Sequence, residues 1–324
     1  MNYLLHIGLN KTGTSTLQVY LGNNRAELLA RGIWYPQMGR DRYAQHDLAQ
    51  GIKEKDLARY GIDAAALKQG GVPPNTETVL LCSENFHTVR EVADVAVLFP
   101  PAQTRVLLYL REHVGYLTSW YQQVAQTRGD LTCSAMDFAR MQGYPFMELV
   151  NRWRAVYGDC LQVRAYERGN LKGGDIVADF FSAAFGMSPP VERRSPDLNP
   201  SISGNLLFVK LVLNHFLTGE ESRRVIEELS ALAGIDKRFT GSIQMAAQEA
   251  GRLAHRYRED RQQLREQFGI GFKPPREGQA GNPVPDLARL KDDIALFLDE
   301  SKKRGFAFHE LFLQKRAFLF PGMA

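Results

Sequence analysis

The chain has 324 residues, of which 44% are hydrophobic and 23% are charged. This composition is typical of a globular protein that buries a sizeable core. The net charge of +4 is small for this length, so the overall charge balance does not favour nucleic acid as a partner. A local site for an anion is still compatible with it.

Targeting and redox features point to the cytoplasm. The N-terminal stretch MNYLLHIG has no basic leader and no small-residue cleavage site, so we expect no secretory signal peptide. No stretch reaches the roughly 18 apolar residues that span a bilayer, and we expect no transmembrane segment. Cys82, Cys133 and Cys160 are widely spaced and odd in number, which fits neither a disulfide framework nor a zinc site.

Short apolar runs alternate with helical patterns in the first part of the chain. The pattern predicts strands at residues 3–8, 78–82, 105–110 and 160–165, and helices at 14–30, 87–99, 114–126 and 175–185. Apolar strands that alternate with helices indicate a parallel sheet covered on both faces. We therefore predict an α/β fold, a three-layer sandwich with a central parallel sheet, whose ligands bind at the carboxyl ends of the strands.

The second part of the chain has a different character. A segment rich in Pro, Ser and Asn follows residue 188 and leads into helical patterns at 204–217, 221–233 and 243–268. One more helix is expected at 287–303, before an aromatic C-terminal segment. We predict an α/β core over residues 1–218 and a helical C-terminal region over 219–324 that packs on it.

A glycine loop joins the first predicted strand to the first predicted helix, in the sequence HIGLNKTGTSTLQ. Gly8, Gly13 and Thr14 have the G-x-x-x-x-G-[ST] spacing of a phosphate-binding loop. The usual lysine at the helix start is absent, and Lys11 stands earlier, inside the loop. Backbone N–H groups and the hydroxyls at the helix start would hold an anion. A plain turn of small residues is the alternative interpretation.

The stretch from Lys11 to Thr16 resembles the 5′-phosphosulfate loop of the sulfotransferases. The donor of that family is 3′-phosphoadenosine 5′-phosphosulfate (PAPS), and a lysine within the loop can reach the group that is transferred from the phosphate. The resemblance implies that the donor is bound by the loop residues Lys11, Thr12, Gly13, Thr14, Ser15 and Thr16.

A second motif matches the same family. The resemblance implies a 3′-phosphate site made of an arginine at a strand end and a serine on the next helix. In RVLLYLREHVGYLTSWYQQ the strand ends at Arg111, and Ser119 follows about two helical turns later. The planar guanidinium of Arg111 suits phosphate oxygens. Together the two motifs are similar to those of bacterial sulfotransferases that modify carbohydrates, over about residues 1–215.

Sulfuryl transfer to a hydroxyl needs a base near the acceptor oxygen, and two residues are candidates. Glu84 follows the strand at 78–82, where cytosolic sulfotransferases carry a catalytic histidine. His46 lies in the loop before the second helix, where some other sulfotransferases carry a catalytic glutamate. Each has a plainer interpretation as a residue at a helix start. The sequence does not decide between them.

These motifs lead to one prediction and two rivals. The resemblance implies a PAPS-dependent sulfotransferase with Lys11 and either Glu84 or His46 as catalytic residues, acting on a small-molecule or glycan hydroxyl, with no metal. One rival is a P-loop kinase or NTPase, and the other is a nucleotide-binding relative that has lost the chemistry. We also expect Arg193 or Arg194 either to contact the nucleotide or to belong to a polar linker.

Overall fold

The computed structural model describes residues 2–66, 71–192, 201–273 and 281–319. The chain forms two compact units that are interleaved in sequence. The first contains Met1–Glu112, Tyr144–Pro196 and Tyr257–Lys273, and the second contains His113–Gly143, Asp197–Arg256 and Pro274–Ala324. Arg193 and Arg194 lie outside the described residues. In the described part of the chain, no helix combines the length and apolar character that crossing a bilayer requires.

A five-stranded parallel sheet is the centre of the first unit, with the order β2-β3-β1-β4-β5. The strands are β1 (Asn2–His6), β2 (Ile33–Trp34), β3 (Thr78–Cys82), β4 (Thr104–Leu110) and β5 (Leu161–Ala165). β1 pairs with both β3 and β4, so His6 lies beside Cys82 on one side and Leu107 on the other. The carboxyl ends of these three strands therefore meet at one edge.

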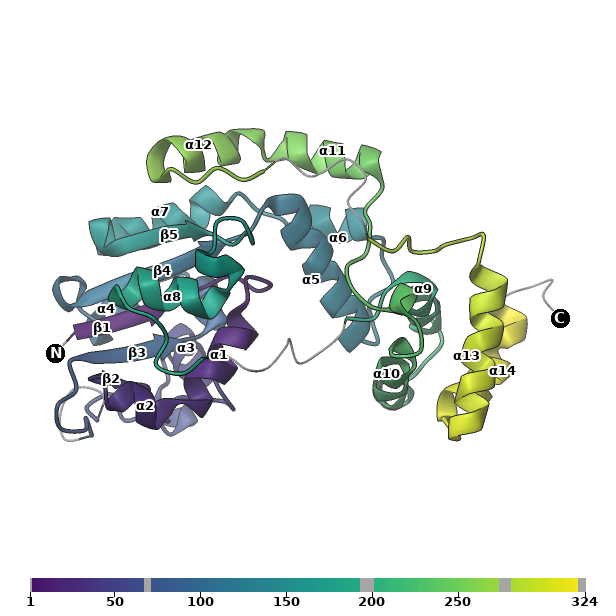
Figure 1. Ribbon diagram of the computed structural model, residues 1–324, viewed down its shortest axis with the longest axis horizontal. Helices are drawn as coiled ribbons and strands as arrows, with labels where there is room; N and C mark the ends of the chain where they lie inside the picture. The colour runs from purple at the N-terminus through teal and green to yellow at the C-terminus, as the bar shows by residue number, and fades with distance from the viewer. Residues whose placement is uncertain (1, 67–70, 193–200, 274–280, 320–324) are drawn as a thin grey trace. The chain divides into compact units, whose positions relative to one another are not determined.

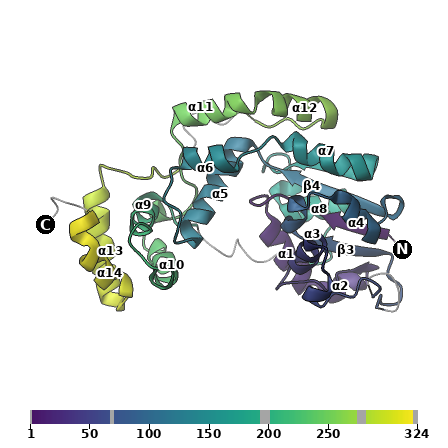
Figure 2. The ribbon, with the colours of Figure 1, turned by 180° about the vertical axis from the view of Figure 1, so that it is seen from behind.

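Helices cover both faces of this sheet, as Figures 1 and 2 show from opposite sides. One face packs against α1 (Thr14–Asn23), α2 (Arg25–Leu29) and α8 (Ile176–Phe185) through a buried cluster that includes Leu4, Leu80 and Leu107. The other face packs against α4 (Val92–Leu98) and α7 (Phe146–Tyr157). The unit also contains α3 (His46–Glu54), the 3-10 helix η2 (Glu84–Thr88) and α12 (Arg258–Phe268). The predicted α/β fold class is confirmed.

The second unit is helical. Its elements are α5 (His113–Thr127), α6 (Ala135–Gln142), α9 (Gly204–Leu213), α10 (Gly219–Ala233), the 3-10 helix η6 (Lys237–Phe239), α11 (Ala247–Arg256), α13 (Leu290–Arg304) and α14 (Ala307–Leu319). α5, α9, α10, α13 and α14 share one hydrophobic core. The boundary expected at residue 218 falls inside this unit, because α5 and α9 bury their apolar faces against the later helices.

Two of the expected helices are each divided into two helices in the structure. The helix expected over 14–30 is interrupted at Asn24, whose side-chain amide donates to the Tyr20 carbonyl at 2.7 Å. Asparagine competes with the helix for backbone groups in this way. The helix expected over 243–268 is divided at Tyr257, which has φ −102° and ψ 19°. Ser203 precedes α9, but its hydroxyl donates to the carbonyls of Arg238 and Thr240 and does not cap the helix.

Candidate functional site

The glycine loop connects β1 to α1 and contains two residues with positive φ. Lys11 and Gly13 both have left-handed conformations, with φ of 64° and 76°. The Thr12 hydroxyl donates to the Leu9 carbonyl at 2.6 Å, which tightens the turn. Left-handed backbone at a lysine is strained by about 1–2 kcal/mol, and such strain is found at functional sites. Successive N–H groups in alternating conformations form a concave site for an anion.

Gly13 has no room for a side chain. A Cβ atom at this position would lie 2.8 Å from Tyr166 Cε2 and 3.2 Å from Ile176 Cγ1. Gly8 is similarly confined, with His6 Nε2 at 2.8 Å from the position of its Cβ. A Cβ at either glycine would therefore displace a neighbouring side chain, and at Gly13 it would also be strained by the positive φ.

The start of α1 suits a negatively charged group. No side chain caps the helix at Gly13, and the first turn contains no acidic residue. The positive end of the helix dipole is therefore not compensated by a carboxylate of its own helix. Ser15 is exposed and Thr16 is half-buried, whereas Thr12 and Thr14 are buried. The Thr12 hydroxyl donates within the loop itself, and the predicted role of Thr12 in donor binding stays a prediction.

Two cations lie at this edge of the sheet. The Arg111 guanidinium follows β4 and donates through Nη1 to the Lys11 carbonyl at 3.3 Å. Burial lowers the pKa of both Lys11 and Arg111, and the neighbouring Arg111 charge lowers that of Lys11 further, while Glu84 opposes this shift. Two positive charges held together at a partly buried site favour a polyanionic ligand.

Residues at the end of β3 fix the start of α3. The buried Gln45 side chain accepts from the Cys82 N–H at 2.8 Å, and the Gln45 N–H donates to the Cys82 carbonyl at 3.0 Å. Gln45 Nε2 also donates to the Pro36 carbonyl at 3.0 Å. These three bonds place His46, the first residue of α3, beside the carboxyl end of β3. The plain interpretation of His46 as a helix start is correct, and it does not conflict with a role at the site.

The two candidate bases lie together. His46 Nδ1 is 2.8 Å from the hydroxyl of Ser83, which is buried, and His46 Nε2 is 3.9 Å from Glu84 Oε1. Both side chains are about one-quarter exposed. Glu84 begins η2, for which the Ser83 side chain is the N-cap and accepts from the Asn85 N–H at 3.1 Å. The two residues, 38 positions apart, are therefore candidates for one joint function.

Sequence reasoning missed a third residue of this group. Gln18, on the second turn of α1, is buried and donates through Nε2 to Glu84 Oε2. The same side chain lies against the Cys82 thiol, whose pKa is raised mainly by burial and lowered by a hydrogen bond from Gln18. Its place four residues after Thr14 puts it on the same face of α1 as the loop. This helical spacing from Thr14 is the sequence feature that could have indicated a place for Gln18 near the loop.

The first unit therefore brings together Lys11, Arg111, His46 and Glu84 from three strand ends and one helix start. Ser119 lies on α5, in the second unit, and is half-buried. His87 is held in place locally: its Nδ1 donates to the Glu84 carbonyl, and burial lowers its pKa. Over the residues that the structure describes, no three His, Cys, Asp or Glu side chains gather as a metal-ligand group.

Comparison with solved structures finds a likeness to a sulfotransferase from Alicyclobacillus acidocaldarius. The two chains are 13% identical, with a TM-score of 0.45 over 84% of this chain and 97% of that chain. No family model matches the sequence. No curated protein matches it either. At this distance the likeness assigns neither residue roles nor an activity to this chain.

Proposed function

We propose that the protein is a sulfotransferase that moves the sulfuryl group of PAPS to the hydroxyl of an acceptor. The observation that carries this proposal is the position of Lys11, in a strained left-handed conformation inside the loop and next to Arg111. A P-loop kinase would hold its lysine at the helix start, where this chain has Thr14.

The chemistry of the loop fits a phosphosulfate. The N–H groups around Gly13 and the uncapped start of α1 suit a phosphate oxygen, and the missing Cβ of Gly13 lets the backbone approach the ligand. Arg111 supplies a second, planar cation for the 3′-phosphate. The role of Ser119 at the same phosphate stays a prediction from the sequence.

In the proposed reaction, Lys11 and the pair of Glu84 and His46 have separate roles. As the acceptor oxygen bonds to sulfur, the bond between sulfur and the bridging oxygen of the donor breaks, and negative charge develops on that oxygen. Lys11 and the loop N–H groups would stabilise this charge. The acceptor proton passes to the pair formed by Glu84 and His46, which lie 3.9 Å apart. The products are the sulfate ester, 3′-phosphoadenosine 5′-phosphate (PAP) and the proton that the pair has accepted.

The finer assignments rest on the sequence motifs. We propose a sugar or other glycan hydroxyl as the acceptor, because the motifs are similar to those of carbohydrate-type sulfotransferases. No nucleic acid and no metal are needed for the reaction as written. A reducing compartment such as the cytoplasm suits Cys82, Cys133 and Cys160, which are free thiols.

Calorimetric titration tests the donor site without knowledge of the acceptor. The purified protein is titrated with PAP and, separately, with ATP and magnesium. We expect micromolar or tighter binding of PAP and a weaker response to ATP. Lys11→Ala and Arg111→Ala should each weaken PAP binding by about 10- to 100-fold, the loss typical of a charge-assisted hydrogen bond.

Two control variants make this experiment decisive. Lys53 and Arg90 are exposed residues of the same unit, and Lys53→Ala and Arg90→Ala should bind PAP like the parent protein. Preference for ATP with magnesium would support a kinase or NTPase instead. Equal PAP affinity in the parent, Lys11→Ala and Arg111→Ala proteins would refute the proposed donor site. PAP binding without any turnover of PAPS would indicate a relative that has lost the chemistry.

A further inference from the structure

We infer that Glu84 accepts the proton of the acceptor hydroxyl, that His46 donates an N–H to the same oxygen, and that Ser83 and Gln18 are positioning residues. This division of roles rests on the proposed sulfuryl transfer. The roles follow from the hydrogen bonds that already occupy one atom of each side chain, Nδ1 of His46 and Oε2 of Glu84.

The Ser83 hydroxyl determines the tautomer of His46. Ser83 Oγ accepts from the Asn85 N–H, and the other hydrogen-bond partner described for it is His46 Nδ1 at 2.8 Å. If the hydrogen lay on Nδ1, the buried Ser83 hydroxyl would have no acceptor for its own hydrogen among the described residues. The satisfied arrangement has Ser83 donating to Nδ1. His46 then carries its hydrogen on Nε2, which faces Glu84.

The Glu84 carboxylate has one committed oxygen and one open oxygen. Oε2 accepts from the buried Gln18 amide, while Oε1 faces His46 Nε2 at 3.9 Å. This distance is too long for a direct hydrogen bond. A single oxygen atom can nevertheless lie within about 2.8 Å of both groups. An acceptor hydroxyl in this position would accept from His46 Nε2–H and donate to Glu84 Oε1.

These contacts assign the base. A neutral imidazole that accepts at Nδ1 and carries a hydrogen on Nε2 has no lone pair left for another proton. Glu84 Oε1 does have one. During transfer the hydroxyl proton moves to Glu84 Oε1 as the new S–O bond forms, and the bridging oxygen of the donor leaves with the electron pair. The proton is afterwards released to solvent, so no further reactant is required.

Gln18 acts through Glu84 and not on the substrate. Gln18 is 6% exposed, and its side chain contacts both the Cys82 thiol and the Glu84 carboxylate. A carboxylate held by one oxygen cannot rotate freely, so its second oxygen keeps its direction toward His46. Losing such an orienting contact typically lowers rates by about 10- to 100-fold.

The tautomer can be measured without any activity. ¹⁵N–¹H correlation spectra of the imidazoles are recorded for the parent protein at a pH of about 9, where histidines are neutral. His46→Gln identifies the His46 signals among the seven histidines. We expect a hydrogen on Nε2 in the parent and a mixture of tautomers in Ser83→Ala. A parent protein with the hydrogen on Nδ1 would overturn the inference, even if PAP binds as proposed.

Kinetics separate the two roles, with turnover of PAPS measured and water as the acceptor. Glu84→Gln should lose about 10²- to 10⁴-fold in rate. His46→Gln keeps an N–H donor and should lose at most about 10-fold, whereas His46→Ala should lose more. The reverse order, with His46→Gln inactive and Glu84→Gln active, would make His46 the base and contradict the inference. PAP affinity should stay within about twofold in all three variants.

A matched pair tests the positioning role of Gln18. Gln50 donates to Glu54 on the exposed side of α3, so Gln50→Leu removes the same kind of contact away from the site. We expect Gln18→Leu to lower the turnover rate about 10- to 100-fold with unchanged PAP affinity, and Gln50→Leu to change neither. Parent-like turnover in Gln18→Leu would refute the positioning role. Failure of the parent protein to bind PAP would instead refute the proposed function.

Discussion

Two buried or half-buried lysines show how differently the two units use positive charge. In the first unit, Lys11 sits in a strained loop, and no acceptor is described within hydrogen-bond distance of its ammonium. In the second unit, Lys210 of α9 is fully buried and donates to the Arg128 carbonyl at 3.2 Å, the Ser222 hydroxyl at 3.2 Å and the Asn214 side chain. The Lys11 ammonium is open to a ligand, whereas the Lys210 amine donates its N–H groups to neighbouring segments of the second unit.

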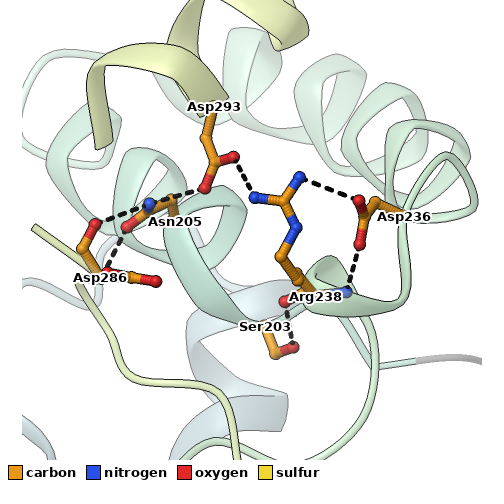
Figure 3. A network of polar contacts seen from close by, with 6 residues as sticks. All are labelled: Ser203, Asn205, Asp236, Arg238, Asp286 and Asp293. Carbon is orange, nitrogen blue, oxygen red and sulfur yellow. Dashed lines mark hydrogen bonds and ion pairs between the residues drawn. The ribbon is translucent and has the colours of Figure 1, made fainter. Parts of the chain in front are cut away.

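The polar groups around η6 in the second unit are, like Lys210, hydrogen-bonded to other groups of the protein. Figure 3 shows Arg238 between Asp236 and Asp293, with Nη1 to Oδ1 of Asp293 at 2.8 Å and Nη2 to Oδ2 of Asp236 at 2.9 Å. Asn205 donates to the second oxygen of Asp293 at 2.8 Å and accepts from the Asp286 N–H at 2.8 Å. Each of these charges finds its partner within the protein. A self-satisfied network fixes the fold, whereas open donors are available for chemistry.

The largest effect should come from Lys11. Lys11→Met keeps the length of the side chain but removes its charge, so the bridging oxygen of the donor loses its stabilising partner. We expect turnover of PAPS to fall by about 10³-fold, or about 4 kcal/mol, as for other groups that stabilise developing charge. The exposed Lys53 of α3 is the control, and Lys53→Met should leave the rate unchanged. If Lys11→Met turned PAPS over at the parent rate, Lys11 would have no role in the reaction, and the proposed contrast with Lys210 would be wrong.

Lys210 should affect stability and its dependence on pH. Burial lowers the pKa of Lys210 to about 8 from 10.5. Between these pH values the unfolded chain binds more protons, so the free energy of unfolding should rise with pH, by up to about 3 kcal/mol. Below about pH 8 this contribution is absent. Denaturant titrations over this range should show the rise in the parent and in the exposed control Lys237→Met, but not in Lys210→Met.

Gly13→Ala should weaken the first unit and its donor site together. The new Cβ meets Tyr166 at 2.8 Å in a backbone with φ +76°, so we expect a loss of about 2 kcal/mol and much weaker PAP binding. Gly186→Ala separates the two causes, because Gly186 has φ +66° and open space around it. That variant should lose about 1 kcal/mol and bind PAP normally. Equal losses of PAP affinity in both variants would argue against a donor site at Gly13.

Asp293→Asn should have the smallest effect. It replaces a buried carboxylate that accepts from Arg238 and Asn205, and we expect thermal denaturation to show a loss of about 1–2 kcal/mol. Asp299, on the same helix, pairs with Lys303 at 2.7 Å but is 60% exposed. Asp299→Asn should change the stability by less than about 0.5 kcal/mol. Similar losses in the two variants would show that the network of Figure 3 contributes no more than a surface pair.

Sequence patterns located the parallel sheet well. The strand predicted at 78–82 coincides with β3, and those predicted at 105–110 and 160–165 differ from β4 and β5 by one residue each. β3 and most of β4 are buried and apolar, which makes them easy to identify, whereas the edge strand β5 contains Gln162 and Arg164 and is only partly buried. The two-residue strand β2 and the helices α6 and α7 were not predicted, and α3 was anticipated only in the plainer interpretation of His46 as a helix start. Their patterns are short or mixed, and their packing partners lie elsewhere in the chain.

What the sequence determined by itself is the local chemistry: a glycine loop between a strand and a helix, a lysine moved into that loop, and an arginine at the end of another strand. These features depend on neighbouring residues, so spacing reveals them. Only the tertiary structure decided that Gln18, His46 and Glu84 share one group, and that Thr12 is used by the loop itself. Parallel pairing of β1 with β3 and β4 brings their carboxyl ends to one edge, across separations of about 70 to 100 residues. No local pattern records contacts made over such distances.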